Sequence, residues 1–383
     1  MKLRNNHILK YLSIVIIFTS WIIFYTIPRD LQYPLFFIPA IVLIFYSFYP
    51  YKKENVIAFI LFGVVIFRFF IPEDFSLTNI SFWAAMIRAI LISSLFLIDR
   101  ESLMKMYGYF RKYLFYIVII SLPFYLLYIA GLLPIGQIAT HVGGDGEGRT
   151  WNVYLFFSLQ DHPIRGEITR FPAIFDEAGF LGTLLALILI IEKLNMTTKE
   201  NKTFLFSGIL TFSLAFYLII FVYYFFNKEY DLKNKIYLGV ISVILLMISY
   251  FLFQEIFTSR VLDRLFTDDS ITIIEDNRIG LGTQQMIISG LKTIDSKLLL
   301  FGGGYQASEG ISFVSATTWV NLVFQLGFVF ICLFTIFSFI FVNKNINNLI
   351  FLFAFYASVL QRPAIFYPLW FFIFIVGIKI RYK

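Results

Sequence analysis

Long apolar runs alternate with short polar turns along most of this chain. Each long run is close to the length, about 20 residues, that carries an α-helix across the hydrocarbon core of a bilayer. We place ten crossings, at 8–27, 33–50, 55–71, 80–98, 114–133, 176–191, 236–253, 317–342, 348–360 and 366–378. Strands of a membrane barrel would show alternating polar and apolar residues instead of solid runs. The pattern therefore predicts an all-α polytopic membrane protein, in which residues 1–383 form one integral membrane domain.

The stretch 203–226 admits two interpretations. As a single helix, it would place the lysine-rich segment 227–235 and the basic residues 379–383 outside the cell. Basic segments prefer the cytoplasmic side of a membrane, so this interpretation conflicts with the positive-inside preference. We therefore expect two short crossings hinged near Thr211-Phe-Ser213, which brings the total to about twelve transmembrane helices.

Two long polar segments interrupt the apolar pattern, at 134–175 and 254–316. Basic turns at 51–54 and 99–112 belong inside, which puts both long segments outside and both termini in the cytoplasm. Within the second segment, apolar residues recur at helical spacing between 278 and 300. We expect an amphipathic helix on the membrane surface there.

Composition agrees with a membrane protein and argues against other classes. Hydrophobic residues make up 59% of the chain and charged residues only 14%, and the mean hydropathy is +0.80. A net charge of +7 would suit a nucleic-acid partner, but basic turns between membrane helices account for it, so we expect no nucleic acid. The single cysteine, Cys332, lies in an apolar run, so disulfide bonds should play no part.

Two arginines occur inside apolar runs. Arg68 lies near the end of its run, where a long side chain can reach the membrane surface. Arg88 lies deeper, where a charge is costly, and we expect it to face a polar cavity and to take part in substrate binding.

The most informative polar cluster is Arg170-Phe-Pro-Ala-Ile-Phe-Asp-Glu-Ala-Gly-Phe-Leu-Gly182, where the first external segment enters an apolar run. A cation, two adjacent carboxylates and two glycines are thereby brought to the mouth of one hydrophobic helix. Asp176 or Glu177 could act as a general base. A structural role at the helix start is the alternative for Glu177, because carboxylates favour helix N-termini.

The spacing of this cluster recurs in the second external segment. Arg170 is followed twelve positions later by Gly182, and Arg278 is followed twelve positions later by Gly290. After Gly290 the chain continues through Phe301-Gly-Gly-Gly304 and an apolar run that contains Gln325-Leu-Gly327.

This arrangement resembles the Wzy-type O-antigen and capsular polysaccharide polymerases, part of a superfamily shared with the O-antigen ligases. The resemblance covers residues 170–330 in specific motifs and the whole chain in hydropathy and length. It implies a polytopic, GT-C-type glycosyltransferase that needs neither metal nor cofactor. The enzyme would join oligosaccharide repeat units carried on undecaprenyl pyrophosphate, at the external face of the bacterial cytoplasmic (inner) membrane. The implied partners are the lipid-linked glycan, membrane lipid and a chain-length regulator protein.

Cations are what such a reaction requires around its pyrophosphate leaving group. Guanidinium binds phosphate oxygens bidentately and keeps its charge at any relevant pH. Arg170, Arg278 and Arg165 are the candidates on the external segments, together with the intramembrane Arg88. The alternative for the external arginines is that they only fix loops through ion pairs with neighbouring carboxylates.

Two other functions remain open. A ligase would generally carry a His-Asn pair before Gly327, and Ala316-Thr317 stands in that place, which favours the polymerase. A flippase or transporter for the same glycan would tend to place ionisable residues along its helices and to show repeated halves. Here the ionisable residues gather in the loops, which favours an enzyme with an external active site.

Overall fold

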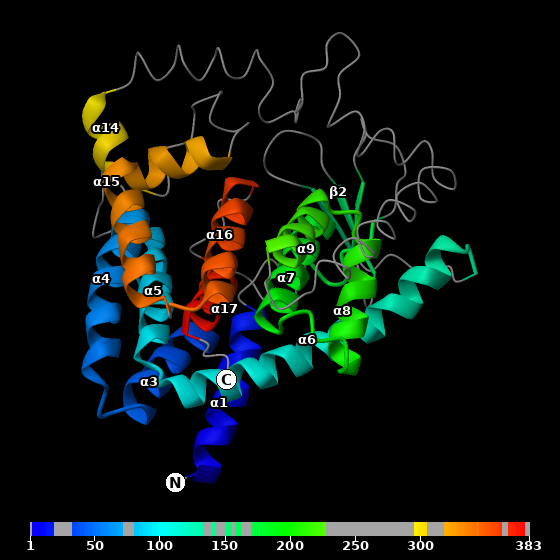
Figure 1. Cartoon of the computed structure of the whole chain (residues 1–383), viewed down its shortest axis with the longest axis horizontal. Coiled ribbons are helices and arrows are strands. Elements are labelled where there is room, and N and C mark those ends of the chain that lie inside the picture. The colour runs from blue at the N-terminus through cyan, green and yellow to red at the C-terminus, as the bar shows by residue number, and fades with distance from the viewer. Residues whose placement is uncertain are drawn as a thin grey trace.

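The structure is a computed structural model. It describes residues 2–18, 33–71, 80–132, 139–142, 150–154, 158–161, 170–175, 177–226, 295–304, 318–342, 344–361 and 367–379. Most of the described residues are helical (Figure 1). The helices are α1 (Lys2–Phe18), α3 (Ile38–Ser47), α4 (Lys53–Phe70), α5 (Ile80–Ser94), α6 (Arg100–Ile129), α7 (Ala178–Ile191), α8 (Lys199–Leu210), α9 (Leu214–Phe226), α14 (Ser296–Phe301), α15 (Thr318–Phe341), α16 (Ile346–Gln361) and α17 (Pro368–Lys379). A π-helical turn, η1 (Tyr33–Phe37), precedes α3, and a 3-10 turn, η2 (Leu95–Leu97), follows α5.

Two of the described helices are long and apolar enough to cross a membrane, by length and composition. They are Arg100–Ile129 and the part of α15 from Asn321 to Phe341. Seven shorter apolar helices accompany them. This agrees with the helical class expected from the sequence. The total of about twelve crossings stays a prediction, because the expected crossing at 236–253 lies outside the described residues. Of the surface helix expected at 278–300, only residues 295–300 are described, and they belong to the short helix α14 and the residue before it.

Helix α6 begins at Arg100 rather than near 114, where the apolar run led us to expect a crossing to start. The basic segment before the run is helical because it carries its own start signals. The Asp99 side chain accepts a hydrogen bond from Ser102 N at 3.1 Å, and Lys105 pairs with Glu101 one turn earlier at 2.6 Å. In Figure 1, α6 runs obliquely across the lower part of the view.

Helices α7 and α17 form the interior of the molecule. Every residue of α7 is buried, and so is α17 from Pro368 to Ile378. Helix α7 packs against α8, α9, α16 and α17. A helix that is apolar on all sides is expected in such an interior position. Phenylalanine rings fill the space beside α17: Phe62 stacks on Phe96 with 4.5 Å between ring centroids and meets Phe374 edge-on at 5.9 Å.

Basic turns gather at one end of the helices. Lys379, at the end of α17, donates from Nζ to Asn55 Oδ1 and to the carbonyl of Phe96, both at 3.2 Å. Arg111 of α6 forms an ion pair with Glu192, which follows α7. The described turns at 51–54 and 99–112 and the end of α17 therefore lie together, at the lower side of Figure 1, and the end of α4 and the starts of α7 and α17 lie at the opposite side.

The exception to the helical prediction is a small sheet in the first long polar segment. Strands β1 (Ala139–Val142), β2 (Thr150–Val153) and β3 (Ser158–Asp161) are antiparallel in the order β1-β2-β3. Threonine, valine and tryptophan in these strands favour extended backbone. Tyr154, which follows β2, donates to the hydroxyl of Tyr128 at 3.4 Å, and burial together with this bond raises the pKa of Tyr154 to about 12. The sheet is thereby attached to the end of α6.

Candidate functional site

Arg170 binds the turn that separates α8 from α9. Its Nε donates to the carbonyl of Thr211 at 2.8 Å, and its Nη2 donates to the carbonyl of Phe212 at 3.1 Å. The next residue, Phe171, donates from its backbone N to the carbonyl of Leu210 at 3.2 Å. The last carbonyls of a helix lack partners within the helix and attract cations, so Arg170 stabilises the end of α8.

The break between α8 and α9 confirms the hinge expected at Thr211-Phe-Ser213. Phe212 has a φ of 45°, a left-handed conformation that ends a helix. Which side of a membrane this turn faces stays a prediction.

Gly182 meets the same turn from the other side. A Cβ at Gly182 would lie 2.5 Å from Thr211 Oγ1 and 2.6 Å from Ser213 Cβ, closer than atoms in contact can approach. Only a glycine lets α7 pass this close to the turn. The two ends of the Arg170–Gly182 cluster therefore meet at one turn, which gives a structural reason for the spacing of twelve that the sequence shows without explaining.

Glu177 occupies the N-cap position of α7, with φ −135° and ψ 134°. Its carbonyl accepts hydrogen bonds from the backbone N of Phe180 at 3.1 Å and of Leu181 at 3.3 Å. Its side chain is half-buried and makes no capping hydrogen bond. Glu177 thus lies at the helix start, as its expected structural role requires. Its carboxylate, however, does not cap the helix. A catalytic role for this carboxylate stays a prediction.

Arg88 of α5 lies between two aromatic rings. Its guanidinium carbon is 5.9 Å from the ring centroid of Phe70, at the end of α4, and 5.9 Å from that of Tyr367, just before α17. These distances allow cation–π attraction. The structure places these two aromatic faces beside Arg88, and the polar cavity expected there stays a prediction.

Residues at and just before the start of α17 connect Arg88 with the start of α7. Tyr367 contacts Arg88, and Trp370, one turn further along α17, packs edge-on against Phe180 of α7 at 5.2 Å. Phe180 lies three residues after Glu177. Arg88, Glu177 and Arg170 are thus placed on neighbouring elements at one end of the helices. Asp176, Arg165 and Arg278 lie outside the described residues, so their positions relative to this group stay predictions.

Backbone hydrogen bonds join the Phe301–Gly304 motif to the helix that contains the Gln325–Gly327 motif. Gly303 N donates to the carbonyl of Phe324 at 2.8 Å, and Gly304 N donates to the carbonyl of Gln325 at 2.9 Å. These carbonyls are available because α15, expected as one uninterrupted crossing, is broken at Gly327, where φ is 81° and ψ is 156°. An interrupted helix in a membrane protein needs such substitute partners for its backbone.

Gly302 and Gly327 face each other across this contact. A Cβ at Gly302 would lie 2.5 Å from the carbonyl oxygen of Gln325, and a Cβ at Gly327 would lie 2.4 Å from Gly302 N. Both residues have a φ and ψ that are essentially restricted to glycine, with φ 69° and ψ 167° at Gly302. Neither position accommodates a side chain.

Arg68 binds this junction and was not predicted to do so. Its Nε donates to the carbonyl of Phe301 at 2.9 Å, its Nη1 donates to the carbonyl of Ile71 at 2.8 Å, and its Nη2 donates to the carbonyl of Gly302. The guanidinium thereby joins α4 to the turn after α14, and its expected position at the membrane surface stays a prediction. The available sequence signal is an arginine one turn before a helix end, which does not identify a partner more than 200 positions away.

Within the part of the chain that the structure describes, no three His, Cys, Asp or Glu side chains come together as metal ligands would. No family model, curated protein or solved structure matches this chain. Functional interpretation therefore depends on the residues and contacts described above and on the resemblance of the motifs.

Proposed function

We propose that this chain is a polysaccharide polymerase of the bacterial cytoplasmic membrane. It would join oligosaccharide repeat units carried on undecaprenyl pyrophosphate at the external face, with both termini in the cytoplasm. The observation that carries this function is the closure of the Arg170–Gly182 motif on the turn at 211–213. That contact supports a reason for the polymerase-like spacing of twelve residues, because it fixes the start of the buried helix α7, where Glu177 is the N-cap residue.

The reaction requires a sugar hydroxyl to attack the anomeric carbon of a second, lipid-linked glycan. A C–O bond forms to the acceptor oxygen, the bond from the anomeric carbon to the pyrophosphate oxygen breaks, and the lipid pyrophosphate leaves. Glu177 would accept the hydroxyl proton, with Asp176 as the alternative base. Arg278, Arg165, Arg170 and Arg88 would bind the phosphate oxygens as negative charge develops on departure.

One observation favours a transporter or flippase as the second candidate. Interrupted helices are characteristic of transporter sites, where broken backbone lines a cavity, and α15 is interrupted at Gly327. Deletion of the gene that encodes this chain, followed by gel analysis of the surface polysaccharide, distinguishes the polymerase from a ligase and from a flippase. Retention of single capped repeat units with loss of longer chains supports the polymerase. Long chains that stay on the lipid carrier indicate a ligase, and loss of all external glycan indicates a flippase.

Glu177→Gln tests the catalytic assignment. Loss of a positioned general base typically costs about 10²–10⁴-fold in rate. We expect almost no polymer in this variant, at a normal protein level in the membrane. Asp176→Asn should be mild if Glu177 is the base. Glu101→Gln is a matched control, because its side chain is 79% exposed at the opposite end of the helices. Full-length polymer in Glu177→Gln would remove this residue from the mechanism.

A further inference from the structure

The exposed side of α6 changes character at Tyr116. Before this residue, the exposed positions of the helix are Glu101, Lys105, Gly108 and Lys112. After it, the exposed positions are apolar: Ile119, Ile120, Pro123, Leu126 and Ile129. The buried side shows no such change, because Leu103 and Val118 are both apolar and fully buried. The change therefore reflects the surroundings of the molecule, and it marks the point at which the outer side of α6 enters a hydrocarbon layer.

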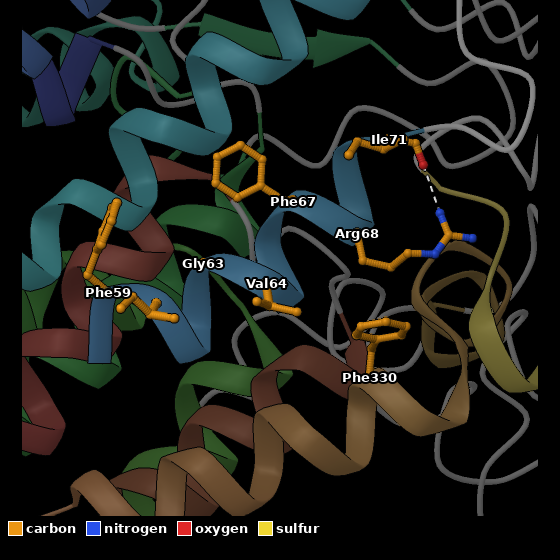
Figure 2. A pocket seen from close by; sticks show the side chains of 8 residues that line it. Phe59, Gly63, Val64, Phe67, Arg68, Ile71 and Phe330 are labelled. Carbon is orange, nitrogen blue, oxygen red and sulfur yellow. Dashed lines mark hydrogen bonds between the residues drawn. The ribbon is translucent and has the colours of Figure 1, made fainter. Parts of the chain in front are cut away.

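The turn between α3 and α4 shows a similar change. Apolar side chains are exposed on α3 up to Phe45 and on α4 from Ile57 onward. Figure 2 shows one of them, Val64, at an open groove that α4 forms with Phe330 of α15. The exposed residues between these two apolar faces are Tyr46, Tyr49, Pro50, Lys52, Lys53 and Glu54. A second boundary between apolar and charged surface thus lies at this turn.

The two boundaries belong to the same end of the molecule. Asn55, which follows the α3–α4 turn, donates from Nδ2 to the carbonyls of Leu97 and Ile98 at 3.4 and 3.3 Å. These two residues come just before α6. The α3–α4 turn and the start of α6 are therefore neighbours, at the lower side of Figure 1.

The lysines at this end differ in whether their charge is compensated. Lys105 forms an ion pair with Glu101 at 2.6 Å. Neither Lys53 nor Lys112 has an ion pair or a hydrogen bond from its ammonium group to any residue that the structure describes. Lys112 Nζ lies 5.9 Å from the ring centroid of Tyr116, a contact that leaves its charge in place.

The positions of these two lysines match a layer of lipid headgroups. Lys112 lies four residues before Tyr116, which is at most about 6 Å along the helix axis, and Lys53 lies four residues before Ile57. Each polar layer outside the hydrocarbon core of a bilayer is about 5–8 Å thick. Tyrosine beside lysine is also typical of the membrane interface. An acidic soluble partner would not require the cations to lie so close to the apolar surface.

We propose that this end of the molecule binds the headgroups of anionic phospholipids, through Lys53 at the α3–α4 turn and through Lys112 on α6. Tyr49 and Tyr116 lie beside them at the edge of the hydrocarbon. The surface is at the opposite end from the proposed catalytic group, so the inference does not depend on polymerase activity.

Native mass spectrometry of the full chain in detergent, titrated with phosphatidylglycerol or phosphatidylcholine, tests this surface. A lysine close to anionic lipid contributes about fivefold to binding, so we expect at least two phosphatidylglycerol molecules to bind about fivefold more tightly than phosphatidylcholine. The double variant Lys53→Gln/Lys112→Gln should lose this preference. Both positions are exposed, so the fold should be unaffected.

The double variant Lys105→Gln/Lys297→Gln is the matched control, because it removes the same two positive charges. Lys105 is already paired with Glu101, and Lys297 is exposed on α14, at the opposite side of Figure 1. We expect this variant to keep the preference. Lys53→Arg/Lys112→Arg should keep it as well, because the charges stay.

Three results would overturn the proposal. Equal binding of both lipids by the wild type would mean that the lysines do not bind anionic headgroups. An equal loss in the Lys105→Gln/Lys297→Gln variant would show that only net charge matters. A full preference in Lys53→Gln/Lys112→Gln would place the bound lipid elsewhere on the molecule.

Discussion

At two breaks in the helical structure, an arginine side chain binds backbone carbonyls and a glycine allows a close contact. The two breaks differ in which atoms lie against the glycine. At the α8–α9 turn, Arg170 binds two carbonyls and Gly182 faces side-chain atoms of Thr211 and Ser213. At the α15 break, Arg68 binds the carbonyls of Phe301 and Gly302 at the turn after α14, and the glycines face backbone atoms. The hydroxyl of Thr211 can rotate away from an added methyl group, and Ser213 Cβ can shift only if the backbone moves, whereas at the α15 break every crowded atom belongs to hydrogen-bonded backbone. The α15 break should therefore be the less tolerant of the two.

Gly327→Ala should have the largest effect on stability. The alanine would adopt a glycine-only conformation, which costs about 1–3 kcal/mol, and its Cβ would overlap the backbone at Gly302, which costs about 1–3 kcal/mol more. A total of about 2–6 kcal/mol is a large part of the stability of a typical domain. We expect strongly reduced folded protein, measured as the yield of monodisperse protein in detergent.

Gly108→Ala is the control for this substitution. Gly108 is an exposed glycine within α6, and a Cβ there would meet no atom within 4 Å. Alanine is a better helix former than glycine by about 1 kcal/mol, so this variant should be neutral or slightly stabilised. A normal yield of Gly327→Ala would contradict the close backbone contact at the α15 break.

Gly182→Ala should be destabilising by a smaller amount, about 1–3 kcal/mol, because only overpacking is involved. Gly182 lies within regular helix, so no backbone strain is added. Unfolding temperature in detergent measures the effect. Ser213→Gly removes one of the two crowding side chains and should restore part of the loss in the double variant, with no comparable relief available for Gly327→Ala. Failure of this rescue would mean that the two breaks are equally rigid.

The two breaks differ in how far they could be predicted from the sequence. The hinge at Thr211-Phe-Ser213 followed from charge, because a single helix would have put basic segments on the wrong side. The break at Gly327 has apolar residues on both sides and no charged neighbour, so hydropathy shows one continuous run.

Contacts between residues far apart in the sequence could not be predicted, for a different reason. Spacing marked Arg170 and Gly182 as a pair, but their common partner is a turn that begins 29 positions after Gly182. Arg68 and Phe301 are 233 positions apart, and neither residue alone indicates the other. The helical class and the locations of candidate residues could thus be predicted from composition and periodicity, while the partners of each arginine depend on tertiary packing.

Lysine substitutions of the two arginines compare the two sites most directly, and one of them, at Arg170, should give the smallest effect. Lysine keeps the charge but replaces a planar fork with a single ammonium group. At Arg170 the two carbonyls belong to adjacent residues, Thr211 and Phe212, so an ammonium that binds one stays close to the other. At Arg68 the carbonyls come from two separate segments, at Ile71 and at 301–302, and three different nitrogens of the guanidinium bind them, whereas a lysine has only one nitrogen.

Hydrogen bonds from charged groups contribute about 1.5–3 kcal/mol each at most, and part of that survives in lysine. We therefore expect Arg68→Lys to lower the free energy of unfolding by about 2 kcal/mol and Arg170→Lys by about 1 kcal/mol or less. Thermal unfolding at constant detergent and lipid concentration gives the ranking, and the reverse order would contradict it. Polymer length adds an independent measurement. If Arg170→Lys is as stable as the wild type but loses polymerisation, Arg170 contributes to the reaction as well as to the turn, and the similarity between the two arginines ends at their backbone contacts.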